Sequence, residues 1–231
     1  MRIGDLIHMF FNGQYMLRIL PELGKGLLVT VEIAALSLAL GVGLGLVLAV
    51  IRVAISRKTT PWPIRLLNYP LVFYVDSMRS IPPLVTLVVV YFALPYLGIY
   101  IPRYWSAVIV FVLVLAAFAE EIFRAGIEAV PPGQVEAARS LGLSFLQTMV
   151  SVVIPQAFRI ALPPLTSRLI AITKDVSLVS VIGVSDLLKV AKMDIARSGN
   201  YSALIAAALL FTLLFWPLMR LSMFVERKLK T

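Results

Sequence analysis

Residues 26–51 read GLLVTVEIAALSLALGVGLGLVLAVI, an apolar run in which Glu32 is the only charged side chain. A helix needs about 20 mainly apolar residues to cross the hydrocarbon core of a membrane. This run is long enough. Its Gly41 and Gly45 stand four residues apart, a spacing that lets a neighbouring helix approach closely. The stretch therefore predicts a membrane-spanning helix that packs against another helix.

Four further apolar runs follow, and they predict spans with unequal clarity. Residues 201–224 are long and nearly free of charge, and residues 104–119 are dense in Val, Leu and Ala. Residues 84–100 are short and interrupted by Pro95. Residues 160–183 contain charges and prolines and are marginal by hydropathy alone. Counting all five runs as spans predicts an all-α membrane protein with five transmembrane helices.

The composition supports this class and excludes several kinds of site. Of the 231 residues, 60% are apolar and 14% are charged, which leaves too little polar surface for a soluble domain. The chain has no cysteine and one histidine, so neither a thiolate nucleophile nor a Cys-ligated metal is available. It also has no phosphate-binding loop of the G-x-x-x-x-G-K-[ST] type. We therefore expect no catalytic residue, no metal site and no bound cofactor in this chain.

The distribution of Lys and Arg predicts the orientation, because basic residues in short loops stay on the cytoplasmic side. Clusters follow the first span and the last. They are Arg52, Arg57, Lys58 and Arg65 after the first span, and Arg220, Arg227, Lys228 and Lys230 in the C-terminal tail. Both clusters are expected in the cytoplasm, and five spans then place the N-terminus outside. The net charge of +9 has the same explanation.

The N-terminal segment, residues 1–25, is expected to lie in the membrane interface. Its apolar residues recur at helical spacing, which is typical of an amphipathic helix. They are Ile3, Leu6, Ile7, Phe10 and Phe11. Residues 26–231 then form one transmembrane domain. The start of the second span stays open, because residues 64–80 fit either an interfacial helix or an extension of that span.

A polar segment between the third and fourth spans, residues 131–155, is expected to be a structured cytoplasmic loop. Residues 134–141 read as a short helix that ends at Gly142, since helices commonly end at a glycine with positive φ. Ser144 and Gln147 then match a capping box at the start of a second short helix. Pro155 is expected to close the segment.

This segment resembles the EAA loop of ABC-importer permeases, E-A-A-x3-G-x9-I-x-L-P. The matching residues are Glu136, Ala137, Ala138, Gly142, Val152, Ile154 and Pro155, with Val and Ile as conservative replacements. The flanking sequences, including KDVSLVSVIG at 174–183, resemble the polar amino-acid branch of these permeases. Glu120 departs from the pattern, since the family usually has a small residue there, and the sequence assigns it no role.

The resemblance implies a type I importer fold and a multi-pass permease subunit in a prokaryotic inner membrane, importing polar amino acids. It also implies partners: two cytoplasmic ATPase subunits that bind ATP and Mg, a second permease that is identical or paralogous, and an extracytoplasmic substrate-binding protein. No nucleic acid is expected. Coupling to the ATPases is then expected at Glu136, Ala137, Ala138, Gly142 and Pro155.

Charged residues in the fourth span need a partner or a cavity, because charge is costly inside a membrane. Arg168 and Asp175 are seven residues apart, on nearly the same helix face and about 10 Å apart along the axis, which suits the two ends of a zwitterion. Related permeases for cationic or neutral amino acids often have an acidic or amide residue in place of Arg168. The resemblance therefore implies an acidic substrate such as glutamate or aspartate. Alternatively, Arg168 reaches the interface and Lys174 pairs with Asp175.

A secondary transporter or channel subunit is the alternative function, since intramembrane charges and proline-broken helices also occur there. That alternative predicts an inverted internal repeat, and we find no pair of corresponding broken segments. An intramembrane enzyme lacks the nucleophile, base or metal ligands it needs. The sequence leaves open which amino acid is carried and whether the second permease is a copy of this chain.

Overall fold

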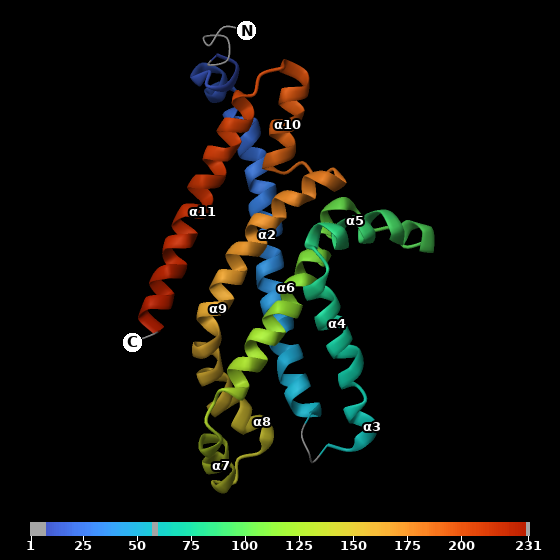
Figure 1. Ribbon diagram of the computed structural model, residues 1–231, viewed down its shortest axis with the longest axis vertical. Coiled ribbons are helices and arrows are strands. Elements are labelled where there is room, and N and C mark those ends of the chain that lie inside the picture. Colours follow the sequence, from blue (N-terminus) through green and yellow to red (C-terminus); the bar gives the residue numbers. More distant parts are fainter. Residues whose placement is uncertain (1–7, 57–59, 230–231) are drawn as a thin grey trace. The chain divides into compact units, whose positions relative to one another are not determined.

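The computed structural model describes residues 8–56 and 60–229 of the chain, and its regular elements in these ranges are helices (Figure 1). The α-helices are α2 Gly13–Ile55, α3 Trp62–Arg65, α4 Asn68–Ser80, α5 Pro83–Ala93, α6 Arg103–Glu128, α7 Pro132–Ser140, α8 Phe145–Thr148, α9 Ile154–Asp175, α10 Leu187–Ser198 and α11 Ser202–Leu229. Short 3-10 helices η1 Leu94–Leu97 and η3 Val176–Ile182, and the π-helix η2 Met149–Val153, join them.

Four helical stretches of the described chain are long and apolar enough to cross a membrane. They are His8–Ile55, Arg103–Glu128, Phe145–Ile182 and Ser202–Phe224. The pair Trp62–Ser80 and Pro83–Leu97 makes a fifth if it is counted as one broken span. The predicted all-α membrane class is confirmed, with four to five spans. The orientation of these spans stays a prediction.

The number of spans is four or five depending on whether α4 and α5, which a break separates, are counted together as one span. Helix α4 ends at Ser80, and Ile81 is extended with φ −86° and ψ 129°. Pro82 disfavours helical geometry in the residue before it, so Ile81 cannot continue the helix. Residues 68–80 are thus a helix of their own, interrupted before the apolar run begins.

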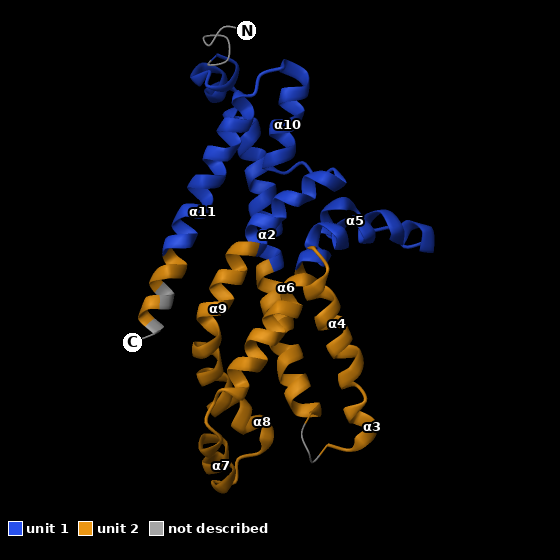
Figure 2. Cartoon of the chain, in the orientation of Figure 1, with its two compact units in different colours: residues 1–37, 83–111, 172–220 blue, residues 38–82, 112–171, 221–231 orange. Residues whose placement is uncertain are grey.

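Contacts divide the chain into two compact units, which Figure 2 colours separately. Unit 1 comprises residues 1–37, 83–111 and 172–220, and unit 2 comprises residues 38–82, 112–171 and 221–231. The core of unit 1 includes Leu23, Leu187, Ala191, Ala203 and Ala207. The core of unit 2 includes Ala49, Ala119, Phe123, Ala157 and Leu165. Small residues in both cores allow helices to approach closely.

In unit 2 the glycines of the first span contact α6, as their spacing predicted. A Cβ added at Gly45 would lie 2.5 Å from the Cβ of Ala119 and 2.8 Å from the carbonyl oxygen of Ala116. A Cβ at Gly41 would lie 2.9 Å from the Cβ of Leu115. Neither site has room for a larger side chain, so the two glycines fix how closely α2 and α6 pack.

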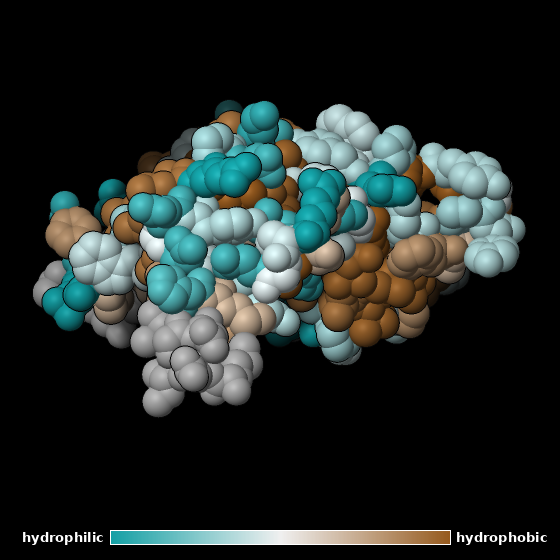
Figure 3. Space-filling model, turned by 90° about the horizontal axis from the view of Figure 1, so that it is seen from above, coloured by the Kyte–Doolittle hydropathy of each residue, from teal (hydrophilic) through white to brown (hydrophobic). Residues whose placement is uncertain are grey.

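Large apolar side chains remain exposed along the candidate spans, and Figure 3 shows brown hydrophobic residues at the surface beside teal hydrophilic ones. Examples are Leu28, Val47, Leu213 and Phe224, each more than half exposed. A soluble protein rarely leaves so much apolar surface in contact with water. These faces are therefore expected to contact lipid or another membrane subunit and not water.

Some sequence predictions fall on the chain ends and on the first basic loop. Ile3, Leu6, Ile7, Arg57, Lys58 and Lys230 lie outside the described residues. Of the predicted amphipathic segment, Phe10 stacks on Tyr201 with ring centroids 5.0 Å apart, while Phe11 is 64% exposed. Helix α2 already begins at Gly13, so helical structure extends well before the predicted span. The interfacial position of residues 1–25 stays a prediction.

Candidate functional site

The loop predicted to be structured, residues 131–155, has the local geometry that its sequence indicates. Helix α7 begins at Pro132, two residues before the predicted start, because proline is favoured in a first helical turn. The chain then turns at Gly142, whose φ is +82°. A Cβ there would meet nothing within 4 Å. The requirement for glycine at this turn is therefore one of backbone conformation and not of space.

The predicted capping box at the start of α8 is also confirmed. The backbone N–H of Gln147 donates to the Ser144 hydroxyl oxygen at 3.3 Å. The backbone N–H of Ser144 donates to Oε1 of Gln147 at 2.8 Å. Both free donors at the helix start are thus satisfied by neighbouring side chains.

The prediction that Pro155 closes the segment is wrong. The chain stays helical from Phe145 through Asp175, with the π-helix η2 between α8 and α9. The N–H of Ile154 donates to the carbonyl oxygen of Met149, five residues earlier. Helix α9 begins at Ile154, so Pro155 stands in its first turn, where a backbone donor is not needed. The change in hydrogen-bond register is what lets the helix pass through a proline.

The surface of the loop combines polar and apolar groups. Glu136, Ala137 and Gly142 are exposed, while Ala138 is buried within the unit. Three large apolar side chains on the same loop are also exposed to solvent. Leu141, Leu146 and Val150 are 84%, 66% and 56% exposed. Such a patch is typical of a surface that a partner covers.

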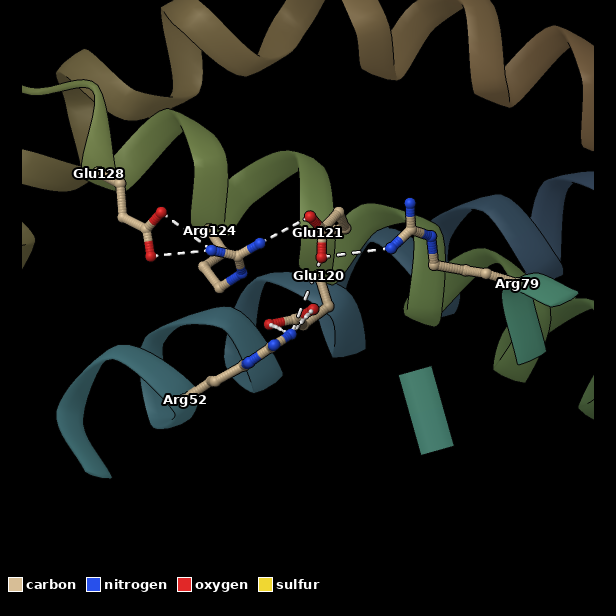
Figure 4. A network of polar contacts seen from close by, with 6 residues as sticks. All are labelled: Arg52, Arg79, Glu120, Glu121, Arg124 and Glu128. Carbon is tan, nitrogen blue, oxygen red and sulfur yellow. Dashed lines mark hydrogen bonds and ion pairs between the residues drawn. The ribbon is translucent and has the colours of Figure 1, made fainter. Parts of the chain in front are cut away.

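An ionic network that the sequence did not reveal joins α2, α4 and α6 in unit 2 (Figure 4). Nη1 of Arg52 lies 3.0 and 3.2 Å from the two carboxylate oxygens of Glu120. The neighbouring Glu121 lies 2.6 Å from Arg124 and 3.3 Å from Arg79. Arg52 is also 3.8 Å from Glu121. The ion pairs therefore share partners and form one connected system.

The network spans a gradient of burial. The Glu120 side chain is fully buried, and that of its partner Arg52 is 16% exposed. At the other end, Arg124 donates to both carboxylate oxygens of Glu128 at 2.9 Å, and the Glu128 side chain is 59% exposed. A buried carboxylate without a partner is very costly, and the ion pair with Arg52 offsets part of that cost for Glu120.

The sequence contains a pattern from which part of this network could have been predicted. Glu121, Arg124 and Glu128 alternate in sign at spacings of three and four, the separation at which helix side chains meet. Arg52 and Arg79 come from other helices, and no local pattern links them to α6. Glu120 was noticed only as a departure from a family pattern, and its role is to pair with Arg52.

The intramembrane arginine singled out by the sequence lies on an aromatic ring. The guanidinium carbon of Arg168 in α9 is 3.2 Å from the ring centroid of Phe118 in α6. Arg79 of α4 lies over the same ring at 5.7 Å. All three residues belong to unit 2. Guanidinium groups are attracted to aromatic faces, so Phe118 of α6 holds two cations, one from α9 and one from α4.

The other predicted substrate-path residue, Asp175, is the last residue of α9 and belongs to unit 1. The spatial relation of Arg168 and Asp175 therefore stays a prediction. In unit 1 Lys174 lies 4.0 Å from the sulfur of Met219 and 6.0 Å from the Phe215 ring. Across the described chain, no group of three or more His, Cys, Asp or Glu side chains is placed to hold a metal ion.

A buried carboxyl in unit 1 caps the start of α10. Asp186 accepts hydrogen bonds from the backbone N–H groups of Leu188 and Lys189 at 3.3 and 3.0 Å. Its backbone packs against α2, since a Cβ at Gly26 would lie 3.0 Å from the Asp186 carbonyl. Burial raises the pKa of this carboxyl to about 6, even though the backbone hydrogen bonds oppose the shift.

Comparisons with known proteins agree on one kind of molecule. Residues 41–231 match the family described as "Binding-protein-dependent transport system inner membrane component". The chain is 35% identical over 214 residues to the arginine transport system permease protein ArtQ of Bacillus subtilis, covering 92% of this chain and 94% of ArtQ. It is 42% identical over 153 residues to the probable amino-acid ABC transporter permease protein YckA of the same organism, or 66% of each chain.

A solved structure shows the same fold. The crystal structure of an amino acid ABC transporter with histidines contains a chain that superposes with a TM-score of 0.79 and 32% sequence identity. The match covers 93% of this chain and 97% of that one. The similarity thus extends over both compact units and not only over the loop at 131–155.

Proposed function

The chain belongs to the family of binding-protein-dependent transport system inner membrane components, and from that premise we propose that it imports acidic amino acids such as glutamate or aspartate. As a member it is a multi-pass permease subunit of an ABC importer and not itself an ATPase. Membership also implies an ATPase and a binding protein as partners, and it decides against the secondary transporter or channel that the sequence left open.

The position of Arg168 is the main support for the proposal that the substrate is acidic. Its guanidinium lies 3.2 Å above Phe118, and Arg79 lies over the same ring at 5.7 Å. Guanidinium groups bind carboxylates through two parallel hydrogen bonds, and they also stack on aromatic faces. A positive charge at Arg168 favours an anion and opposes a cation, whereas the charge of Arg79 is already paired with Glu121. We propose that Asp175, the second predicted substrate-path residue, also lies along the path of the substrate.

The experiment compares uptake of four amino acids by the assembled transporter in liposomes: glutamate, aspartate, glutamine and arginine. Arginine is included because the relative ArtQ is named for arginine transport. The variants Arg168→Gln and Arg168→Lys are compared with wild type, and Arg159→Gln on the exposed part of the same helix is the matched control. The affinity of the binding protein for each amino acid is measured separately.

The expected result is loss of glutamate and aspartate uptake in Arg168→Gln, by about tenfold for one charged hydrogen bond. Arg168→Lys should recover part of the lost uptake, because lysine keeps the positive charge but lacks the planar guanidinium that binds a carboxylate through two hydrogen bonds. Arg159→Gln should transport at the wild-type rate. Wild-type uptake of acidic amino acids by an assembled Arg168→Gln transporter would remove the basis of the proposal.

For energy coupling, we propose that the loop at 131–155 is the surface on which the ATPases dock. Glu136, Ala137, Ala138, Gly142 and Pro155 carry the family pattern of this loop. The exposed apolar patch of Leu141, Leu146 and Val150 supplies the surface to be buried. In this arrangement two ATPases hold ATP and Mg, and a second permease, a copy of this chain or a paralogue, completes the pore.

A further inference from the structure

A polar cavity of about 270 Å³ lies in unit 2, beside the exposed end of the ionic network. It is formed where α2 ends, where α4 begins and where α6 ends. Its lining is Arg52, Val53, Ser56, Asn68, Arg124 and Glu128. These are the ends of helices that the basic-residue distribution predicts to lie at the cytoplasmic face of the membrane.

Two buried polar atoms in the lining have no hydrogen-bond partner among the described residues. They are Nε of Arg124 and Oδ1 of Asn68. The other nitrogens of Arg124 are engaged, Nη1 by Glu128 and Nη2 by Glu121. Nε is therefore a buried donor without a hydrogen-bond partner in the wall of the cavity, and Oδ1 is a buried acceptor without one. Buried polar atoms in proteins are normally satisfied, so each of the two indicates a binding partner of opposite hydrogen-bonding type.

The charges of the lining favour a ligand that has both signs. Arg52 and Arg124 supply positive charge, and Glu128 supplies a carboxylate. The six-residue ionic network contains three arginines and three glutamates and is neutral in sum. The Glu128 carboxylate pairs with Arg124 and, at 59% exposed, has room to accept a further hydrogen bond, so a ligand that also carries an N–H donor fits better than a simple anion. A phosphate accompanied by an N–H donor satisfies both sides: the phosphate accepts from Arg124 Nε, and the ammonium donates to Asn68 Oδ1 and Glu128.

The neighbouring surface indicates that this ligand comes from the membrane. Trp62 and Tyr69 are each 72% exposed and Leu67 is 60% exposed, in the residues that flank Asn68. Exposed Trp and Tyr side chains are typical of the membrane interface, where their rings lie at headgroup level. We propose that this cavity binds the phosphoethanolamine headgroup of a membrane phospholipid and holds the ends of α2, α4 and α6 at the interface.

The test uses the assembled transporter, purified in detergent and stripped of lipid. Native mass spectrometry measures binding of phosphatidylethanolamine, and phosphatidylcholine serves as the comparison because its quaternary amine has no N–H to donate. Thermal stability is measured with the same lipids and with soluble phosphoethanolamine. The variants are Arg124→Lys, which keeps a charge but lacks Nε, and Asn68→Leu, which lies outside the ionic network. Arg159→Lys, on an exposed part of α9, is the matched control.

Wild type is expected to bind phosphatidylethanolamine about tenfold more tightly than phosphatidylcholine, and each cavity variant to lose about tenfold. Arg159→Lys should bind as wild type does. Equal binding of the two lipids, or unchanged binding in an assembled Asn68→Leu transporter, overturns the proposal. So does stabilisation by soluble phosphoethanolamine as strong as that by the lipid, since the cavity would then take a soluble molecule. A wild-type transporter that responds to none of these ligands shows that the cavity holds water only.

Discussion

Two regions of unit 2 are stabilised in opposite ways. The loop at 131–155 is held by local backbone chemistry: a glycine turn at Gly142 and a capping box whose partners, Ser144 and Gln147, are three residues apart. The ionic network is held by side chains distant in sequence, since Arg52 and Glu120 are separated by 68 positions. The loop is largely exposed, whereas Glu120 has no exposed surface.

The difference predicts how each region responds to substitution. When a cap or turn residue of the loop is replaced, water satisfies the backbone groups that are released. When a partner in the buried end of the network is replaced, the remaining charge loses its nearest counter-charge in a place where water reaches it poorly. Large losses of stability are therefore expected in the network, while the loop should lose partner coupling before it loses stability.

The largest effect is expected for Glu120→Ala. Arg52 then loses its nearest carboxylate and keeps only Glu121 at 3.8 Å, so the expected loss of stability is about 3 kcal/mol, the lower end for breaking a buried ion pair. Replacing both partners together, as Arg52→Met with Glu120→Leu, should cost much less because no buried charge remains. Thermal inactivation of the assembled transporter measures both. If the double variant is as unstable as Glu120→Ala, packing and not charge accounts for the loss.

The second prediction concerns Asp186. This residue is buried like Glu120 and caps a helix like Ser144. Its folded pKa of about 6 exceeds the ordinary value for aspartate. The stabilising contribution of the neutral carboxyl is full below pH about 4 and is lost as the pH rises through about 6. Asp186→Asn keeps a capping oxygen and removes the titration.

The Asn variant should therefore be more stable than wild type above pH 6, by about 1–3 kcal/mol, and close to it below pH 4. Melting temperatures across this pH range, measured on the purified complex, give the comparison. A difference that does not change with pH would mean that Asp186 stays ionised in the folded protein and that capping alone sets its contribution.

Gly142→Val should have a smaller effect on stability, about 1–2 kcal/mol, because a β-branched residue is disfavoured at positive φ. Its main consequence is a displaced α7 relative to α8 and hence poor ATPase docking. Gly133→Val is the matched control, since that site is equally open but does not have positive φ. Transport per ATP hydrolysed should fall only in Gly142→Val. Equal coupling in the two variants argues against a docking role for the turn.

The smallest effect is expected at the exposed end of the network. Glu128→Gln removes a pair whose carboxylate is 59% exposed. Exposed ion pairs contribute less than about 1 kcal/mol, and here the basic residue precedes the acid, the weaker order on a helix. Thermal inactivation of the lipid-stripped transporter, in which only the ion pair is tested, should barely change. A loss comparable to that of Glu120→Ala would mean that the network acts as one unit regardless of burial.

The two regions also differ in how far the sequence could predict them. The turn at Gly142 and the cap at Ser144 depend on neighbours within a few residues, so local patterns found both. Pro155 was misread because the π-helix before it, which shifts the hydrogen-bond register, has no local pattern that we recognised. The pairing of Arg52 with Glu120 depends on how α2 meets α6. The glycines of the first span indicated a close contact but not its partner.

The central claim, an ABC permease that selects acidic amino acids, is tested most directly by uptake into liposomes containing the wild-type transporter with its ATPase and binding protein. We predict ATP-dependent accumulation of glutamate and aspartate that excess glutamine or arginine competes with poorly. Arg168→Gln should abolish that preference without changing binding-protein affinity. Accumulation of arginine or glutamine in preference to the acidic amino acids, unchanged in Arg168→Gln, would contradict it.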